Sequence, residues 1–219
     1  MAERHEEKYL IDYRQYALLK ARASRVLAPD PNGESYLITS LYYDDPVNTA
    51  LLEKQDGLAL HTKFRLRTYD CRDGFIRLER KVKQGIITQK ISAPVTAQQL
   101  PFLGMPEWDT DRFSETARDL AVQMAAGGLR PAIAVRYRRD AFLFPGTDLR
   151  LTFDTCLEAL APDAEALFDR DAAAVPVLDG NTVIMEIKYG SFLPAFIRTL
   201  TAVNCRQLSV SKYALCREE

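Results

Sequence analysis

The sequence predicts an α+β fold, a closed antiparallel β-barrel of about eight strands with its helices packed on the outside. Two observations lead to this prediction. Segments with the two-residue alternation of a β-strand recur about eight or nine times, whereas helical spacing is confined to a few stretches. Short turn signals join several of the alternating segments, as is typical of antiparallel strands.

The stretch from His61 to Ser92 shows the alternation most clearly. Lys63, Arg65 and Arg67 fall on one face of its first segment, and apolar residues fall on the other. If the apolar face packs on helices, the cationic face must line a solvated groove or a wet barrel interior. Turn signals divide the stretch into an antiparallel meander of three segments, 61–69, 75–83 and 86–92.

The elements before the meander follow from local signals. Residues 4–11 alternate as a strand, and Asp12 with Gln15 three residues later is a helix N-cap signal. A helix that covers one outer face of the barrel is therefore expected from Tyr13 to Leu27, because apolar residues then follow at helical spacing until Pro29. A strand at 36–44 and a short helix at 47–57 complete this part.

After the meander the expected elements alternate between the two classes. Gly127 and Gly128 end one of the helices, and Pro194 lies in the first turn of another. Residues 155–181 are acidic and rich in alanine, so mostly loop is expected there. Strands are predicted at 132–144, 148–154, 182–189 and 208–215, and helices at 95–100, 109–126 and 192–203.

Composition limits the class of protein. The chain has 219 residues, 47% of them hydrophobic, and no linker-like stretch, which favours a single domain over residues 1–219. Lys and Arg number 29 against 30 Asp and Glu, so nucleic acid is not the expected partner. No signal peptide or long apolar run is present, so a cytoplasmic protein is expected. The four scattered cysteines predict reduced thiols.

Charge is unevenly distributed over the predicted strands. Cations dominate the polar strand faces although the whole chain has a net charge of −1. Solvated strand faces would mix the two signs, and crowded cations repel one another, so the pattern predicts a polyanion site. The cations are Arg4, Lys8, Lys63, Arg65, Arg67, Arg77, Lys81, Lys83, Lys90, Arg139, Arg150, Lys188 and Lys212, and the carboxylates are Glu6, Glu79, Asp154 and Glu186.

A carboxylate among these cations suggests a divalent metal. Glu186 is the best candidate ligand, because it lies in mid-strand between the apolar Met185 and Ile187. Mg²⁺ or Mn²⁺ would suit a carboxylate oxygen combined with phosphate oxygens. The alternative is an ion pair of Glu186 with Lys188 or with an arginine across the barrel. The sequence contains no P-loop, no GxGxxG turn and no Ser/His/Asp or Cys/His set.

A series of short motifs resembles a known family. In chain order they are RHEEKY, SLYYD, FRLRTY, LERK, the lysine of ITQK, YRRDAF, RLTFD, VIMEIK and SKY. This order resembles the VTC (vacuolar transporter chaperone) polyphosphate polymerase domain, a branch of the triphosphate tunnel metalloenzymes. The resemblance spans almost the whole chain.

The resemblance implies a closed tunnel that binds the triphosphate of ATP. It further implies that Mn²⁺ or Mg²⁺ is used and that the γ-phosphoryl group passes to a growing inorganic polyphosphate. Glu186 matches the metal-binding position, and Arg65, Arg67, Lys81 and Arg139 are expected to act in the transfer. The positions that match phosphate-binding residues, with Tyr137 as their neighbour, are Lys8, Arg65, Arg67, Lys81, Lys90, Arg139, Ser211 and Lys212.

The first strand departs from the pattern of the tunnel hydrolases. Triphosphatases and class IV adenylate cyclases resemble one another in an N-terminal ExExK strand, whereas this chain has Arg4, Glu6 and Lys8. A cation in place of the first carboxylate favours polymerase over hydrolase. Two alternatives stay open: a tunnel triphosphatase whose water is activated by Glu6 or Glu79, and a polyphosphate-binding module without catalysis. The chain shows no membrane segment to couple synthesis to export.

Overall fold

The computed structural model describes residues 5–85, 87–103, 113–190 and 192–218, so Arg4 lies outside the described residues. The chain divides into two compact units. Because the division passes through the four strands β3, β7, β8 and β9, each unit contains several chain segments. Whether they form the predicted single domain stays a prediction. Unit 1 comprises Met1–Tyr36, Tyr137–Leu157 and Pro176–Ser211, and unit 2 comprises Leu37–Arg136, Glu158–Val175 and Lys212–Glu219.

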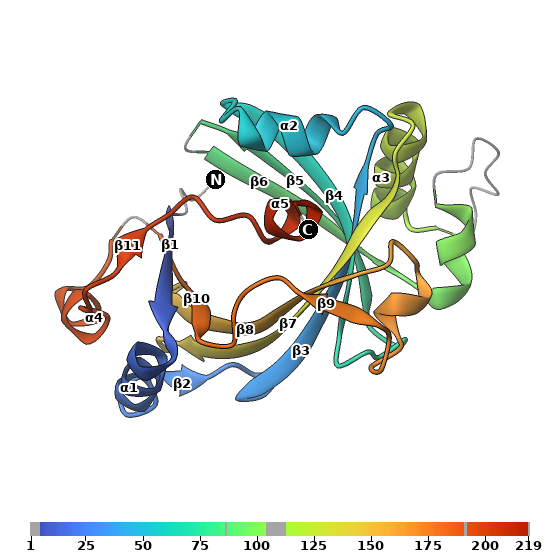
Figure 1. Cartoon of the computed structure of the whole chain (residues 1–219). Helices are drawn as coiled ribbons and strands as arrows, with labels where there is room; N and C mark the ends of the chain where they lie inside the picture. Colours follow the sequence, from blue (N-terminus) through green and yellow to red (C-terminus); the bar gives the residue numbers. More distant parts are fainter. Residues whose placement is uncertain (1–4, 86, 104–112, 191, 219) are drawn as a thin grey trace. The chain divides into compact units, whose positions relative to one another are not determined.

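A mainly antiparallel sheet and a few helices make up the fold, which confirms the predicted α+β class (Figure 1). The hydrogen-bonded order is β11-β1-β10-β8-β7-β3-β4-β5-β6, with β2 beside β7 and β9 beside β8. Among the described residues this order has two ends, so the sheet is not closed and the predicted barrel is not confirmed. The strands are β1 (His5–Asp12), β2 (Ala28–Pro29), β3 (Ser35–Asp44), β4 (Leu60–Tyr69), β5 (Ile76–Gln84), β6 (Ile87–Val95), β7 (Arg130–Leu143), β8 (Arg150–Leu160), β9 (Ala174–Pro176), β10 (Thr182–Tyr189) and β11 (Arg206–Gln207).

The helices are short and lie between strands in the sequence, except α5, which follows the last strand. Six residues or fewer form each of α4, α5 and the 3₁₀ helices η1 and η3 of the described ranges. The helices are α1 (Tyr13–Ala23), α2 (Thr49–Gln55), η1 (Ala97–Phe102), α3 (Glu115–Ala126), η3 (Glu165–Leu167), α4 (Ala195–Leu200) and α5 (Lys212–Arg217). No helix in the described ranges has the length and apolar character that crossing a bilayer requires.

In unit 2 the predicted meander is confirmed. Strands β4, β5 and β6 pair antiparallel in sequence order, and their register places Lys63, Lys81 and Lys90 side by side. Leu66 and Leu78 are paired on the opposite face, and both are fully buried. The alternation read from the sequence therefore assigns each side chain of these strands to the correct face.

Helix α3 packs on the apolar face of the meander, where Leu120 and Met124 join the core. Its N-cap is Ser114, whose side chain accepts a hydrogen bond from the backbone of Ala117. A helix at Tyr13–Leu27 had been expected over this outer, apolar face. That prediction named the wrong helix, because α1 buries its apolar side in the core of unit 1 instead.

In unit 1, β1 and β8 flank β10 with antiparallel registers. The predicted cap of α1 is confirmed: Asp12 Oδ1 accepts from the Gln15 backbone at 2.7 Å, and Gln15 Oε1 accepts from the Asp12 backbone at 3.0 Å. Tyr16 and Leu19 of α1 pack with Phe153 and other apolar residues of these strands. The opposite face of the three strands is polar.

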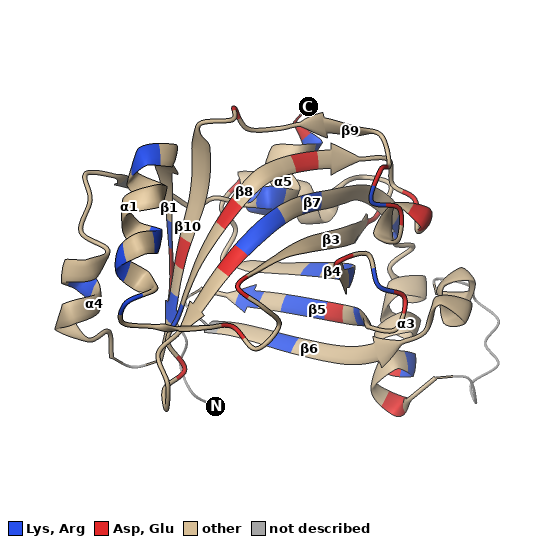
Figure 2. Ribbon diagram, turned by 90° about the horizontal axis from the view of Figure 1, so that it is seen from below, with Lys and Arg blue, Asp and Glu red and all other residues tan. Residues whose placement is uncertain are grey.

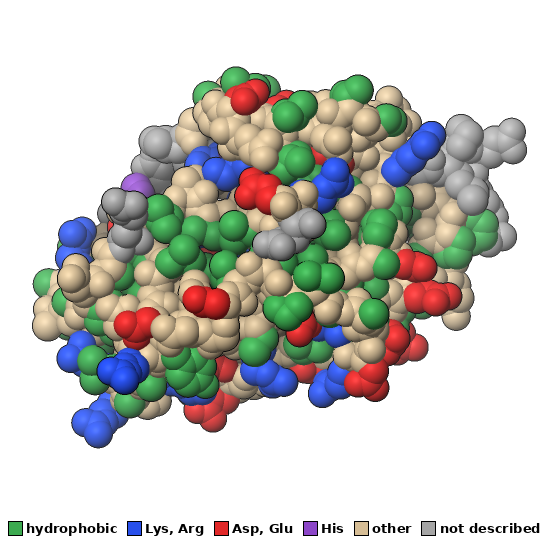
Figure 3. All heavy atoms as spheres, viewed as in Figure 1, with side chains coloured by type: hydrophobic (Ala, Val, Ile, Leu, Met, Phe, Trp, Pro, Cys, Tyr) green, Lys and Arg blue, Asp and Glu red, His purple; other side chains and the backbone are tan. Residues whose placement is uncertain are grey.

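Two predictions about the second half of the chain were wrong. Residues 155–160 continue β8 rather than forming loop; Cys156, in the left-handed region at φ 50°, interrupts the regular strand geometry there. Residues 212–217 form α5, whereas a strand had been expected at 208–215. On the molecular face drawn in Figure 3, charges of both signs are interspersed with hydrophobic side chains.

Candidate functional site

The meander of unit 2 presents a polar side with a strong excess of cations, which we call the cationic face. Figure 2 shows Lys and Arg on all three of its strands. On the described residues of β4–β6, the register places one carboxylate, Glu79, on this side. The cations are Lys63, Arg65 and Arg67 of β4, Arg77, Lys81 and Lys83 of β5, and Lys90 of β6.

Glu79 is the centre of the contacts on this face. It is 3% exposed, and its Oε2 accepts from Arg65 Nε at 2.6 Å and lies 2.6 Å from Arg65 Nη2. Its Oε1 pairs with the ammonium of Lys90 on the next strand. Arg65 also donates from Nη1 to the Tyr42 hydroxyl at 2.9 Å. Glu79 thus holds two cations from neighbouring strands in place.

The electrostatics follow from these contacts. Burial alone would raise the pKa of Glu79, but Arg65, Arg67 and Lys90 outweigh it and hold that pKa far below its usual range. Burial, together with Arg65 and Arg67, lowers the pKa of Lys90 despite the opposing effect of Glu79. Glu79 therefore stays ionised throughout the physiological range.

Helix α5 lies against the cationic face of unit 2. The Tyr213 ring is 5.1 Å from the Tyr42 ring, between centroids, and 5.0 Å from the Lys63 ammonium. Its hydroxyl donates to the buried Asp44 carboxylate, which also accepts from the backbone of Ala50 in α2. These contacts fix the orientation of α5, which begins at the predicted phosphate-binding residue Lys212.

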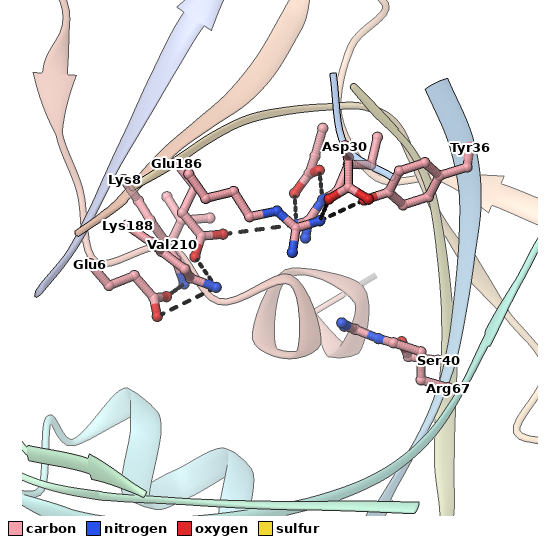
Figure 4. Close-up of polar contacts among 12 residues, drawn as sticks. Glu6, Lys8, Asp30, Tyr36, Ser40, Arg67, Glu186, Lys188 and Val210 are labelled. Atoms are coloured by element: carbon pink, nitrogen blue, oxygen red, sulfur yellow. Dashed lines mark hydrogen bonds and ion pairs between the residues drawn. The ribbon is translucent and has the colours of Figure 1, made fainter. Parts of the chain in front are cut away.

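The polar side of unit 1 has balanced charges. The register pairs Lys8 with Glu186 and Glu6 with Lys188. Lys8 Nζ lies 2.8 Å from Glu6 Oε1 and donates to the Val210 carbonyl at 3.1 Å, and Lys188 Nζ lies 2.7 Å from Glu186 Oε1 (Figure 4). Each of these cations thus has a carboxylate beside it.

The arginines of unit 1 are held in the same way. Arg139 donates from Nε and Nη2 to the two oxygens of Asp154, at 2.6 and 2.7 Å, and its Nη2 lies 3.9 Å from Glu186. Arg150 binds Asp30 and the Tyr36 hydroxyl, each at 2.6 Å (Figure 4). Although burial lowers the pKa of Arg139, Asp154 raises it well above its usual value. Arg139 and Asp154 form a buried bidentate pair.

The comparisons with known proteins agree with the motif pattern. The VTC domain model matches residues 3–218. The chain belongs to the VTC domain family. No curated protein sequence matches this VTC domain significantly.

Solved structures show the same fold at low identity. The VTC domain is similar to a chain of the Schizosaccharomyces pombe Mediator head module, with TM-score 0.52 and 10% identity over 92% of this chain and 96% of that one. The PH1819 protein of Pyrococcus horikoshii OT3 has TM-score 0.50 and 11% identity over 98% and 96%. A candidate adenylate cyclase of Bacillus halodurans has TM-score 0.50 and 12% identity over 91% and 87%. At such identities the likeness shows the fold alone.

Burial and the neighbouring oxygen atoms decide whether the surroundings of Glu186, the predicted metal ligand of the VTC domain, suit a divalent ion. Glu186 is 4% exposed, and the register places it opposite Thr152, whose buried hydroxyl has no hydrogen-bond partner among the described residues. A carboxylate and a hydroxyl are oxygen ligands that suit Mg²⁺ or Mn²⁺. No cluster of three or more acidic, His or Cys side chains suited to a metal occurs in the described ranges. The residues fit an ion held mainly by phosphate oxygens.

The structure also shows the alternative that the sequence left open for Glu186. The Lys188 ammonium lies at Oε1 without hydrogen-bond geometry, and Arg139 is the nearby arginine. An ion bound at Oε1 would have to displace the Lys188 ammonium. The ligand role of Glu186 therefore stays a prediction.

The predicted site residues fall into the two units. Unit 2 brings together Arg65, Arg67, Lys81 and Lys90 on the cationic face, with Lys212 at the start of the helix against that face. Arg67 is 8% exposed and donates to Ser40 at 3.1 Å. Unit 1 contains Lys8, Tyr137, Arg139, Glu186 and Ser211, and the Tyr137 ring lies 5.3 Å from the Arg139 guanidinium carbon.

Sequence reasoning missed several partners of these residues. Asp154 had been placed on a polar face, but its bidentate bond to Arg139 depends on how β7 and β8 are arranged. The roles of Tyr42, Asp30 and Tyr36 were not predicted. Alternation within SLYYD could have placed Tyr42 on the polar side of β3, but it could not have named Arg65 as its partner.

Proposed function

We propose that this VTC domain is an ATP-dependent polyphosphate polymerase, which transfers the γ-phosphoryl group of ATP to a growing inorganic polyphosphate. The observation that carries the proposal is the cationic face of unit 2, where cations outnumber carboxylates along three neighbouring strands. Such crowding is unfavourable without a counter-anion, and a chain of phosphates supplies negative charge along its whole length. Family membership supports the same class of ligand.

The residues of the cationic face suit this chemistry. Arg65 and Arg67 are two residues apart on one side of β4, roughly 6–7 Å along the strand. Guanidinium groups bind phosphate oxygens through paired N–H donors, and lysines such as Lys81 and Lys90 neutralise them as point charges. In phosphoryl transfer the protein mainly positions the reacting groups and stabilises charge. These four cations are proposed to do both.

A polymerase fits the carboxylates better than a hydrolase does. A phosphate acceptor is already an anionic nucleophile and needs no general base, whereas hydrolysis requires an activated water. The two carboxylates that could serve as base are engaged: Glu6 lies between Lys8 and Lys188, and Glu79 lies between Arg65 and Lys90. The lowered pKa of Glu79 further makes it a poor base.

A divalent ion is part of the proposal. Glu186, with Thr152 opposite, would hold Mn²⁺ or Mg²⁺, and such an ion supplies charge neutralisation on phosphate oxygens when bound. In this chain Lys188 sits at the same carboxylate, so the ammonium would have to leave Glu186 as the ion binds.

The test is a product assay with purified protein, ATP and Mn²⁺ or Mg²⁺. Long-chain polyphosphate is the expected product, and Arg65→Ala should lower its yield while Arg80→Ala should not. Arg80 is the matched control because it lies on the opposite side of β5 and donates to Gln123. Free phosphate without polymer would mean a triphosphatase. Binding of polyphosphate without turnover would mean a binding module.

A further inference from the structure

Tyr42 of β3 is paired in register with Arg65 and lies on the cationic face of unit 2. Its hydroxyl accepts from Arg65 Nη1 at 2.9 Å, and the guanidinium carbon lies 5.7 Å from the centroid of its ring. On the other side, Arg65 Nε and Nη2 are bound to Glu79. The guanidinium is therefore held by groups from two strands, a phenol from β3 and a carboxylate from β5.

We propose that Tyr42 is a positioning residue, whose hydroxyl holds the Arg65 guanidinium in the orientation in which the cationic face binds phosphate groups. This inference rests on the proposed function, because it takes phosphate to be the ligand. A planar guanidinium that is bound at all three nitrogens has its plane fixed, and a fixed plane is what bidentate recognition of phosphate requires. Tyr42 itself, 8% exposed, acts through Arg65.

The surroundings of the Tyr42 hydroxyl are mainly cationic. The facing groups from β4 are all positive. Glu79 of β5 contacts Arg65, which in turn donates to Tyr42, and Lys90 of β6 contacts Glu79. The Tyr213 ring of α5 packs on the Tyr42 ring, and the Tyr213 hydroxyl is directed to Asp44 instead. The facing groups by element are Lys63, Arg65 and Arg67 of β4, Glu79 of β5, Lys90 of β6, Tyr213 of α5, and Ser40 and Asp44 of β3 itself.

These cations make the positioning sensitive to pH. Burial raises the pKa of Tyr42, but Arg65, Arg67 and Lys63 together lower it to about 8. When the phenol loses its proton to solvent, the phenolate pairs with the cations that phosphate would bind. Phosphate and phenolate then compete, so affinity falls as pH rises through about 8. By linkage, bound phosphate should raise the pKa of Tyr42 and cause a proton to be taken up.

The experiment is isothermal titration calorimetry of tripolyphosphate without metal, at about pH 7 and about pH 9. The proteins are the wild type, Tyr42→Phe and Tyr43→Phe. Tyr43 is the matched control, because it is the next residue of β3, lies in the apolar core, and has its pKa raised by burial. All three proteins are first compared by thermal unfolding at both pH values.

Tyr42→Phe and Tyr43→Phe are expected to differ in their affinity for tripolyphosphate and in its pH dependence. At about pH 7, Tyr42→Phe should bind about three- to tenfold more weakly than the wild type, since Arg65 loses one charge-assisted hydrogen bond. Between the two pH values the wild type and Tyr43→Phe should lose about tenfold more affinity than Tyr42→Phe, since only about a tenth of Tyr42 stays protonated at about pH 9. Changes in the ligand's own charge are common to all three proteins and cancel.

The inference is overturned if Tyr42→Phe shows the affinity and the pH dependence of the wild type. If the wild type does not bind tripolyphosphate at all, the proposed function fails, and the inference fails with it. Should Tyr42→Phe not fold, the wild type alone decides. In that case the near-ultraviolet absorbance of tyrosinate is followed with pH: bound tripolyphosphate must move the lowest tyrosine ionisation to higher pH, and an unmoved titration contradicts the role of Tyr42.

Discussion

The polar faces of the two units contain similar types of residue but differ in the balance between cations and carboxylates. In unit 1 each cation of the polar face has a carboxylate beside it: Lys8 has Glu6, Lys188 has Glu186, and Arg139 has Asp154. In unit 2 the described strands β4–β6 share the single carboxylate Glu79 among their cations. The contacts of unit 1 thus pair each of these cations with a carboxylate, whereas on β4–β6 of unit 2 the cations outnumber the carboxylates.

This difference shows what a row of cations on a strand means. Lys and Arg residues occupy alternate strand positions in both units, but in unit 1 Lys8 and Lys188 each have a carboxylate two residues away on the same strand, whereas β4 of unit 2 has none. The carboxylates beside the cations distinguish an ion-pair network from a face with excess positive charge. Breaking the buried Arg139–Asp154 pair of unit 1 should therefore change stability first, and removing a cation of the cationic face in unit 2 should change ligand binding and turnover first.

The largest effects are expected from opposite faces of β5. Leu78→Glu should unfold the domain, since Leu78 is fully buried in the core under α3 and an unpaired buried carboxylate costs several kcal/mol. Lys81→Glu should leave the thermal midpoint nearly unchanged, because Lys81 lies between Lys63 and Lys90, yet it should abolish polyphosphate binding. Thermal unfolding and polyphosphate affinity of both variants check this. A stable Leu78→Glu with an unfolded Lys81→Glu would mean that the faces are reversed.

Glu186→Gln should abolish turnover of ATP while tripolyphosphate binding remains measurable. The amide keeps the size of the side chain but loses the charge that would hold a divalent ion. Turnover with Mn²⁺ and with Mg²⁺ is measured beside calorimetric binding without metal. Normal turnover with either ion would assign Glu186 to the ion pair with Lys188 alone.

Arg139→Ala should lower the free energy of unfolding by about 3–5 kcal/mol, because it leaves the carboxylate of Asp154 buried without its partner. Denaturant titration measures this loss. Asp154→Ala in the same chain is the control, and the double variant should recover part of the stability, since no charge then remains unpaired. If Arg139→Ala left the free energy of unfolding unchanged, the proposed contribution of the buried pair to stability would be contradicted.

Arg65→Ala and Arg67→Ala should each lower kcat/KM for ATP by about 10²-fold or more, as expected for phosphate contacts that act in the transition state. Steady-state kinetics measure the loss, with Arg80→Ala as the folded control from the opposite face of β5. Unchanged kinetics in both would place β4 outside the site and remove the contrast between the units.

The smallest effect concerns the acid side of the pH profile. The folded-state pKa of Glu79 is held below its unfolded value near 4.5 by Arg65, Arg67 and Lys90, even though burial raises it. The stabilisation from its charge is therefore fully present above that unfolded value and is lost as pH falls below it. The stability difference between the wild type and Glu79→Gln should shrink on acidification from neutral pH, as denaturant titrations would show. A difference independent of pH would mean that Glu79 contributes only packing.

The sequence by itself determined which face each strand residue occupies, because successive side chains of any extended strand point in opposite directions. It therefore predicted the cationic face, with Arg65 and Arg67 on one side of β4 and Leu66 on the other. The cap of α1 by Asp12 and the end of α3 at Gly127 are local signals that the structure confirms. The motif order also led to the correct family.

Only the tertiary structure decided which of these side chains meet. Whether Arg65 reaches Glu79 and Tyr42 depends on strand registers, and these are set by the packing of whole faces rather than by any local pattern. The short apolar stretch 208–215 fits strand or helix equally well. Its residues from Lys212 onward lie in α5, where the Tyr213 hydroxyl donates to Asp44, a residue 169 positions away. No local propensity predicts that contact.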